Sequence, residues 1–306
     1  MLLNMLDEIR SFVVLAESGS LRRASERLFL TPSALTRQIQ RLEQALGTSL
    51  LDRGVKPARI TRAGRAVLDR GRHVLRVMDD LKAMASPHAE PSGTFRLGIA
   101  HALAQASLVG AIQRLTSRFG RLRPVITTDL TRTLLEQLRT GGLDAALTLM
   151  PASGGAPSDM DAAVVGTERL VLIRARDRER RVPGPGLDAP WVVNPLGCLI
   201  RQALEVKLRE MGLPFRVAAE IHNVEMQLSL VASGLGLGVV PARLLATHPR
   251  RRHLEQLTRT GVTLSAAIVF VRAGHLGQLD LAAAFLQDAL AEHFASVTAT
   301  RKGATG

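Results

Sequence analysis

The sequence is poor in cysteine, because Cys198 is the only one among 306 residues. A single cysteine excludes a framework of internal disulfides and is typical of a reducing compartment. No apolar run approaches the roughly 18 residues that a membrane span requires, and Asp7 and Glu8 interrupt the first ten residues, unlike a secretory signal. We therefore expect a cytoplasmic protein without a membrane partner.

Motifs for catalysis are also missing. The eight histidines are scattered without metal-ligand spacing, and Cys198 has no base close to it in the sequence. Neither a nucleophile elbow nor a phosphate-binding loop occurs, and the glycine-rich string at Gly234–Gly238 precedes a strand pattern where a dinucleotide loop would follow one. We predict a protein that is not an enzyme and that uses no cofactor and no metal.

Acidic residues are in the minority, 27 against 40 basic ones, so the formal net charge is +13. This balance favours a polyanionic partner such as double-stranded DNA. Lysine occurs at only four positions, and genomic base composition explains that arginine bias better than selection for phosphate contacts. The charge therefore indicates a partner class and says nothing about the fold.

The chain changes character at residues 86–93, where Pro87, Pro91 and Gly93 form a helix-breaking stretch. Before it the periodicity is helical, apart from an interruption between residues 50 and 62. After it helical patterns alternate with short strand patterns at Thr94–Ala100, Val125–Asp129, Ala145–Met150, Leu170–Arg174, Trp191–Asn194, Leu237–Val240 and Ala267–Arg272. This order predicts an α/β multi-domain protein whose second part contains a largely parallel sheet.

Three short helices are expected near the N-terminus. The first ends near Ser18-Gly19, and its apolar face consists of Phe12, Val13, Leu15 and Ala16. Ser20 is the expected N-cap of the second helix, whose buried face consists of Leu21, Ala24 and Leu28. Thr31 caps the third helix and Pro32 is its first residue. The inner stripe of this third helix consists of Leu35, Ile39, Leu42 and Leu46.

The outer face of the third helix carries hydroxyl, amide and guanidinium groups at Ser33, Thr36, Arg37, Gln40 and Arg41. Two short helices joined by a tight turn place such a face in the major groove of DNA, where arginine reads guanine and glutamine reads adenine. An ordinary solvated helix face explains the same residues equally well.

The order and spacing of these segments resemble the LysR-type regulator signature. The matching strings are Ser20–Leu28, Thr31–Ile39, Leu42-Glu43, Leu46-Gly47, Leu50–Arg53 and Ile60–Gly64. The resemblance implies a winged helix-turn-helix over residues 1–62 that is all-α apart from its wing. Its implied DNA-binding residues are Ser20, Arg22, Thr31, Pro32, Ser33, Thr36, Arg37, Gln40, Arg41, Arg53, Lys56 and Arg59.

The resemblance places the wing at Leu51–Thr61, with Arg53, Lys56 and Arg59 near the DNA backbone or minor groove. Arg53 has an alternative role, in which it hydrogen-bonds its own loop. The sequence departs from the family at Pro32, where a base-reading glutamine is frequent, so readout is expected to shift to Ser33, Thr36 and Arg37. Leu51 likewise replaces a phenylalanine, which affects packing more than binding.

Residues 63–86 are expected to form a linker helix. Val67, Val74, Met78 and Leu81 repeat at steps close to seven residues, which is typical of a seam between two helices. Packing against the chain's own core is the alternative. By resemblance the helix forms a homodimer, family members commonly assemble further into homotetramers, and a hinge at residues 87–93 follows.

Residues 94–300 resemble an effector-binding domain of the type 2 periplasmic-binding fold. Lobe one is expected at about 94–165 and 265–300, lobe two at about 166–264, and a tail at 301–306. The matching strings are Leu138–Leu147, Pro190–Val193 and Leu230–Pro241. Strand ends and helix N-termini supply the contacts in such a cleft, and the candidates are His101, Ala102, Thr128, Thr131, Asn194, Cys198, His222 and Asn223.

Three of these candidates have ordinary alternatives. Thr131 is equally suited to a plain N-cap, and His222 to a surface position. Cys198 is either a redox sensor or, since no second cysteine can resolve an oxidised thiol, a buried or cleft-lining thiol.

Together these patterns predict a sequence-specific, DNA-binding transcription regulator that is modulated by an unidentified small-molecule effector, with RNA polymerase as a further partner. The alternatives are a solute-binding protein and an architectural DNA-binding protein. The C-terminal half alone supports the first, and the charge alone supports the second.

Overall fold

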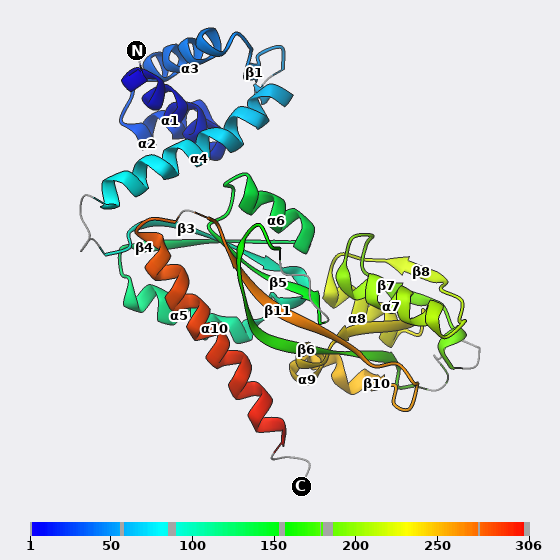
Figure 1. Ribbon diagram of the computed structural model, residues 1–306. Helices are drawn as coiled ribbons and strands as arrows, with labels where there is room; N and C mark the ends of the chain where they lie inside the picture. The colour runs from blue at the N-terminus through cyan, green and yellow to red at the C-terminus, as the bar shows by residue number, and fades with distance from the viewer. Residues whose placement is uncertain are drawn as a thin grey trace. The chain divides into compact units, whose positions relative to one another are not determined.

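The computed structural model describes the chain in segments, namely residues 2–55, 58–84, 90–152, 157–177, 179, 186–274 and 276–302. They form two compact units. The N-terminal unit consists mainly of Met1–Glu90, and the C-terminal unit consists of Pro91–Leu138, Leu143–Gly274 and Leu281–Gly306. The first is built of helices with one small hairpin, and the second is mixed α/β (Figure 1).

The N-terminal unit contains α1 (Leu2–Ser18), α2 (Leu21–Leu28), α3 (Pro32–Leu46), the antiparallel pair β1 (Leu51–Asp52) and β2 (Arg59–Ile60), and α4 (Arg62–Met84). The predicted caps are confirmed. The Ser20 side chain accepts a hydrogen bond from Arg23 N, and the Thr31 side chain accepts one from Ala34 N, directly before Pro32. These caps fix where the two helices of the helix-turn-helix begin.

A compact apolar core lies between α1, α2, α3 and α4, with Phe12, Ala24, Leu35, Ile39 and Leu42 buried in it. Two residues predicted for buried faces are exposed instead. Leu21 is 37% exposed and Leu46 is 42% exposed. Each is a terminal residue of its helix, where the apolar stripe runs beyond the neighbouring helices.

The two alternatives for the linker helix apply to different faces of α4. Leu68, Val67 and Leu75 pack against the core of the unit itself, with Val67 half-buried. This contact favours the alternative of packing against the chain's own core for this face, and a seam at Val67 stays a prediction. Val74, Val77 and Leu81 are 37%, 38% and 56% exposed. Their spacing of three and four residues places them in one stripe of the helix. Residues 85 and 86, the end of the predicted linker helix, lie outside the described residues.

In the C-terminal unit strands alternate with helices, as the sequence pattern predicted. In chain order its elements are β3 (Gly93–Ala100), η1 (His101–Leu103), η2 (Ala106–Leu108), α5 (Val109–Arg118), β4 (Leu122–Asp129), α6 (Thr131–Arg139), β5 (Ala145–Pro151), β6 (Asp161–Ala175), η3 (Gly186–Asp188), β7 (Trp191–Val193), α7 (Leu199–Glu210), β8 (Val217–Glu220), α8 (Val224–Ala232), β9 (Leu237–Pro241), α9 (Ala242–Thr247), η4 (Pro249–His253), β10 (Leu254–Gln256), β11 (Leu264–Arg272) and α10 (Leu279–Lys302). Of the predicted hinge, residues 87–89 lie outside the described residues, as do residues 303–306 of the predicted tail.

Nine strands form one sheet in the order β4-β3-β5-β11-β6-β9-β7-β8, with β10 beside β6. Strand β3 pairs in parallel with β4 and β5, and β7 pairs in parallel with β8 and β9. Between these two groups, β11 and β6 are antiparallel to their neighbours. The expectation of a largely parallel sheet therefore holds within each group but is wrong for the sheet as a whole.

The two parallel groups are two lobes joined by the long strands β6 and β11, which run from one group to the other (Figure 1). Strand β6 has 15 residues, although the sequence pattern indicated only Leu170–Arg174. Its first part pairs with β11 in one lobe, and Leu170–Ile173 pair with β9 in the other. The chain thus passes between the lobes within continuous strands.

Candidate functional site

The outer face of α3 presents exposed polar groups, although the hydroxyl of Ser33 lies 3.1 Å from that of Thr31. Ser33, Arg37 and Gln40 are exposed. Within the part of the chain that the structure describes, neither Arg37 nor Gln40 has a side-chain partner. Thr36 is half-buried, and its hydroxyl donates to the carbonyl of Pro32 over 2.8 Å. Arg37 and Gln40 are therefore the two long side chains of this face that are available to an external partner.

Several other predicted DNA-binding residues already have intramolecular partners. Arg22 pairs with Glu26 at 3.0 Å. Arg41 lies 3.5 Å from the carboxylate of Glu8, which is buried in α1. The hydroxyls of Ser20 and Thr31 serve as helix caps. These residues shape and orient the helix-turn-helix whatever else they contact.

The wing is tied to α3 through one carboxylate. Glu43 accepts hydrogen bonds from the backbone N–H groups of Leu50 at 2.8 Å and Leu51 at 3.2 Å, and from Arg53 Nη2 at 2.8 Å. Burial alone would raise the pKa of Glu43, but these hydrogen bonds outweigh it and lower the pKa below its ordinary value. This geometry favours the alternative in which Arg53 holds its own loop. Arg59 is exposed on β2, and Lys56 lies outside the described residues.

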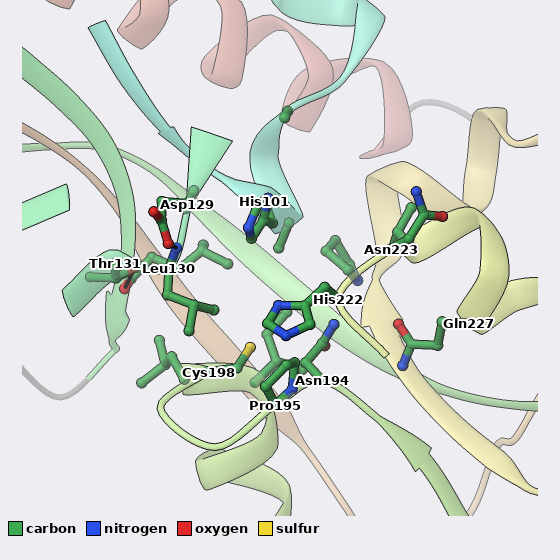
Figure 2. A pocket seen from close by; sticks show the side chains of 18 of the residues that line it. His101, Asp129, Leu130, Thr131, Asn194, Pro195, Cys198, His222, Asn223 and Gln227 are labelled. Atoms are coloured by element: carbon green, nitrogen blue, oxygen red, sulfur yellow. Dashed lines mark hydrogen bonds between the residues drawn. The ribbon is translucent and has the colours of Figure 1, made fainter. Parts of the chain in front are cut away.

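A pocket of about 210 Å³ opens in the C-terminal unit (Figure 2). It lies where the carboxyl ends of β3, β4 and β5 from one lobe meet those of β7, β8 and β9 from the other, the usual position of ligands in open α/β sheets. Its lining residues are Ala100, His101, Ala102, Ala104, Asp129, Leu130, Thr131, Leu149, Asn194, Pro195, Cys198, Leu199, Ile200, His222, Asn223, Val224, Gln227, Val239 and Pro241.

The structure brings seven of the eight predicted effector-binding residues together around this pocket, namely His101, Ala102, Thr131, Asn194, Cys198, His222 and Asn223. Thr128 is not among the lining residues and is exposed near the end of β4. Side chains alternate between the two faces of a strand, so its neighbour Asp129 faces the pocket instead. Sequence reasoning did not select Asp129, although it is the last residue of the same strand.

Hydrogen bonds within the chain shape the rim of the pocket. Asp129 Oδ1 accepts the N–H of Leu130 at 2.7 Å, and the Thr131 hydroxyl donates to the carbonyl of Leu149 at 3.3 Å. Because α6 begins at Thr131, this residue lies inside the helix and is not a plain N-cap. Asn223 Oδ1 accepts the N–H of Met226 at 2.9 Å and caps α8.

The buried arginine Arg201 braces the two loops of the second lobe that reach the pocket. Its guanidinium donates to Glu205 at 2.7 Å, to Glu220 at 2.6 Å and to the carbonyl of Asn194 at 3.3 Å. Asn194 Nδ2 in turn donates to the carbonyl of Ile221 at 3.3 Å. Since Asn194 lines the pocket and Ile221 precedes His222, this network fixes both loops.

Cys198 occupies the N-cap position of α7 and lines the pocket. Burial raises the pKa of its thiol above the ordinary value, although the N–H groups of Arg201 and Ile200 oppose that shift. A protonated, pocket-lining thiol fits this environment better than a reactive thiolate.

Two classes of site are absent from the described segments. No group of three or more histidine, cysteine, aspartate or glutamate side chains in them is arranged to hold a metal ion. No helix in them combines the length and the apolar character needed to cross a membrane.

Residues 6–65 match the family described as bacterial regulatory helix-turn-helix protein, lysR family, and residues 88–295 match the LysR substrate binding domain. The second match alone spans more than half of the chain. The chain belongs to the LysR family. Its relatives include the HTH-type transcriptional regulator DgdR of Burkholderia cepacia, which is 30% identical over 85% of this chain and 86% of its own, and YofA of Bacillus velezensis, which is 26% identical over 81% and 84%.

Solved structures of this LysR-type regulator's relatives agree in fold. A full-length variant of OxyR from Pseudomonas aeruginosa matches with a TM-score of 0.73 at 20% identity, over 93% of this chain and 94% of its own. Full-length CbnR in complex with its target DNA matches with a TM-score of 0.61 at 18% identity, over 93% and 99%. Winged helix-turn-helix and two-lobed α/β domains therefore occur in one chain, as predicted.

Family membership confirms the predicted function. The chain is a DNA-binding transcription regulator with an effector-binding domain, of a family that is typically modulated by small molecules, forms oligomers and is not enzymatic. The predicted alternatives, a solute-binding protein and an architectural DNA-binding protein, receive no support.

Proposed function

We propose that the exposed face of α3 reads the base edges of an operator through Ser33, Arg37 and Gln40. The observation that carries this proposal is the combination of free guanidinium and amide groups on a helix that is capped at Thr31. Arginine pairs with guanine and glutamine with adenine in the major groove. Arg59 and Lys56 of the wing contact the phosphate backbone, while Arg53, paired with Glu43, holds the wing in place.

The chain acts as a homo-oligomer. Residues 1–62 bind DNA and residues 63–86 dimerise, with the apolar stripe of Val74, Val77 and Leu81 on α4 as the seam. A dimer presents two recognition helices to related half-sites. A hinge at 87–93 and an effector-binding domain at 94–300 follow, with a tail at 301–306. Tetramers form from these dimers, the site of action is the cytoplasm, and RNA polymerase is the protein partner at promoters.

Ligand binding in the pocket between the lobes is thermodynamically coupled to the shape of the oligomer that binds DNA. A ligand that binds one arrangement of the lobes more tightly than another shifts the equilibrium between oligomer shapes. A change of shape alters the spacing and the bend that the oligomer imposes on its half-sites. The coupling is reciprocal, so operator DNA changes the affinity of the ligand by the same factor.

Genome-wide mapping of bound DNA tests the proposed readout. The wild type is compared with Arg37→Ala and with Arg209→Ala, an exposed arginine of α7 whose loss changes the net charge equally. We expect discrete sites for the wild type and Arg209→Ala, and weakened or lost sites for Arg37→Ala, since one bidentate base contact contributes about 1–3 kcal/mol of discrimination. Unchanged sites in Arg37→Ala would overturn the assignment of this face.

A further inference from the structure

Three α-helices begin at the wall of the pocket. Thr131 starts α6, Leu199 starts α7 and Val224 starts α8, and all three residues line the pocket. The first four N–H groups of a helix have no intrahelical acceptor, and a helix start carries the equivalent of about half a positive charge. The pocket thus favours a ligand that carries a negatively charged group.

A buried amide in the same wall requires a hydrogen-bond donor from the ligand. Gln227 is fully buried, and its Nε2 donates to the carbonyls of Val192 at 3.0 Å and Val239 at 3.5 Å. Both carbonyls can only accept, so the orientation of the amide is fixed. Its Oε1 is buried and has no partner among the described residues. Gln227 lines the pocket, and its amide is turned toward the side where Asn194 and His222 lie (Figure 2). A buried acceptor without a donor is rare in native proteins, and a ligand with an N–H group would supply one.

The charges around the pocket limit the ligand further. Asp129 contributes a carboxylate, and only its Oδ1 has a partner in the described segments, the N–H of Leu130. None of the described residues lining the pocket is lysine or arginine, and His101 and His222 are its only basic side chains. A ligand with two or more negative charges would meet Asp129 without a fixed cation to balance it. A ligand with a single carboxylate and one positively charged group matches the charges that line the pocket.

We propose that the effector is a small zwitterion, a monocarboxylate that also carries an ammonium group, as an α-amino acid does. The carboxylate faces the starts of the helices, and the ammonium group pairs with the carboxylate of Asp129. Gln227 Oε1, on the other side of the pocket, accepts an N–H group from the side chain of the ligand (Figure 2). This inference rests on the proposed function, in which this pocket is the effector site, and it adds the chemical class of the ligand.

The test uses the full-length protein and matched sets of compounds in calorimetric titrations. The twenty proteinogenic amino acids are screened first, together with the 2-hydroxy acid, the 2-oxo acid and the amine that share each side chain. The best amino acid is expected to bind at least tenfold more tightly than its hydroxy and oxo counterparts, and the amine is expected not to bind. The hydroxy acid keeps a donor but loses the positive charge, and the oxo acid loses both.

Two substitutions and one control complete the test. Asp129→Asn keeps the acceptor for the Leu130 N–H and removes the charge. It should therefore weaken binding of the amino acid at least tenfold and binding of the oxo acid much less. Gln227→Met removes the acceptor on the other side of the pocket, so it should weaken binding of the amino acid and of the oxo acid that shares its side chain to a similar extent. Thr128→Ala, at the neighbouring position outside the pocket, should bind like the wild type.

Three results would overturn the inference: an oxo or hydroxy acid that binds as tightly as its amino acid, an amine that binds, or no binding by any compound of the panel. None of these results would affect the interpretation of the mapping experiment with Arg37→Ala, which does not depend on the pocket. Failure of the ligand class and failure of the DNA-binding assignment are therefore distinguishable.

Discussion

Arg53 donates from Nη2 to Oε2 of Glu43 across 2.8 Å, while Oε1 of the same carboxylate accepts the N–H groups of Leu50 and Leu51. One side chain of α3 thereby joins the recognition helix to the first strand of the wing. The Glu43 side chain is 10% exposed and that of Arg53 is 47% exposed. We therefore expect Arg53 to contribute to DNA binding chiefly through the position of the wing.

This relationship predicts non-additive effects on DNA affinity. Arg53→Gln and Glu43→Gln should each weaken operator binding by about fivefold, about 1 kcal/mol, and the double variant should lose no more than either one. Anisotropy titrations at several salt concentrations measure both the affinity and its salt dependence. If Arg53 instead neutralises a phosphate, only Arg53→Gln loses affinity, and the slope of log K against log salt falls by about one.

The lowered pKa of Glu43 predicts a pH dependence of stability. A carboxyl group whose folded-state pKa lies below its unfolded value stabilises the fold above the unfolded value, and this stability is lost as pH falls through the folded value. We expect part of the free energy of unfolding of the wild type to disappear as pH falls below 4.5, the ordinary value for glutamate. Urea titrations over this range should show a smaller loss for Glu43→Gln.

Glu26→Gln, an exposed position on α2 of the same unit, is the control and should follow the wild type. If the free energy of unfolding falls equally steeply with decreasing pH in the wild type and in Glu43→Gln, Glu43 has no share in the acid sensitivity.

Gly64 allows the start of α4 to approach the wing. A Cβ atom there would lie 2.2 Å from the carbonyl oxygen of Leu50 and 2.8 Å from Cγ2 of Ile60, so Gly64→Ala should destabilise the N-terminal unit by about 2 kcal/mol or more. Gly110 lies in α5 with open space at its Cβ position. Gly110→Ala should therefore raise stability by up to about 1 kcal/mol. Thermal unfolding of both variants checks the pair, and a neutral Gly64→Ala would contradict the close approach.

The raised pKa of Cys198 predicts a slow thiol. Only the thiolate reacts readily with alkylating agents and peroxide, so the rate of carbamidomethylation should stay low near neutral pH and reach half its maximum above pH 9.0, the ordinary value. Peroxide should change transcription no more in cells with the wild type than in cells with Cys198→Ser. Rapid oxidation of Cys198 by dilute peroxide would instead support a redox role.

Local signals allowed the helix-turn-helix to be predicted closely from the sequence, because caps act over three or four residues. Ser20 and Thr31 cap their helices as expected. Burial at helix ends depends on the length of the neighbouring helices, which explains why Leu21 and Leu46 were misplaced. The partners of Arg41 and Arg53 are set by tertiary packing, and sequence spacing cannot show a glutamate 10 or 33 residues away as an ion-pair partner.

The pocket was only partly predictable. Strand ends and helix starts indicated its rim, but strand register decides which of two adjacent residues faces inward, and here Asp129 does so and Thr128 does not. Gln227 gave a weak signal, a polar residue on a largely apolar helix, whose meaning depends on the carbonyls of Val192 and Val239 beside it. The crossing of β6 between the lobes was missed because its first part, Asp161–Arg169, lacks a continuous apolar pattern.

The most direct test of the whole account asks whether the pocket controls DNA binding. Affinity for one mapped site is measured with and without the dialysable fraction of a cell extract, for the wild type and for Ala104→Trp, which places a bulky side chain at an exposed position lining the pocket. The account predicts that the fraction changes the affinity or footprint of the wild type and leaves Ala104→Trp unchanged. No effect on the wild type, or the same effect on both proteins, would contradict it.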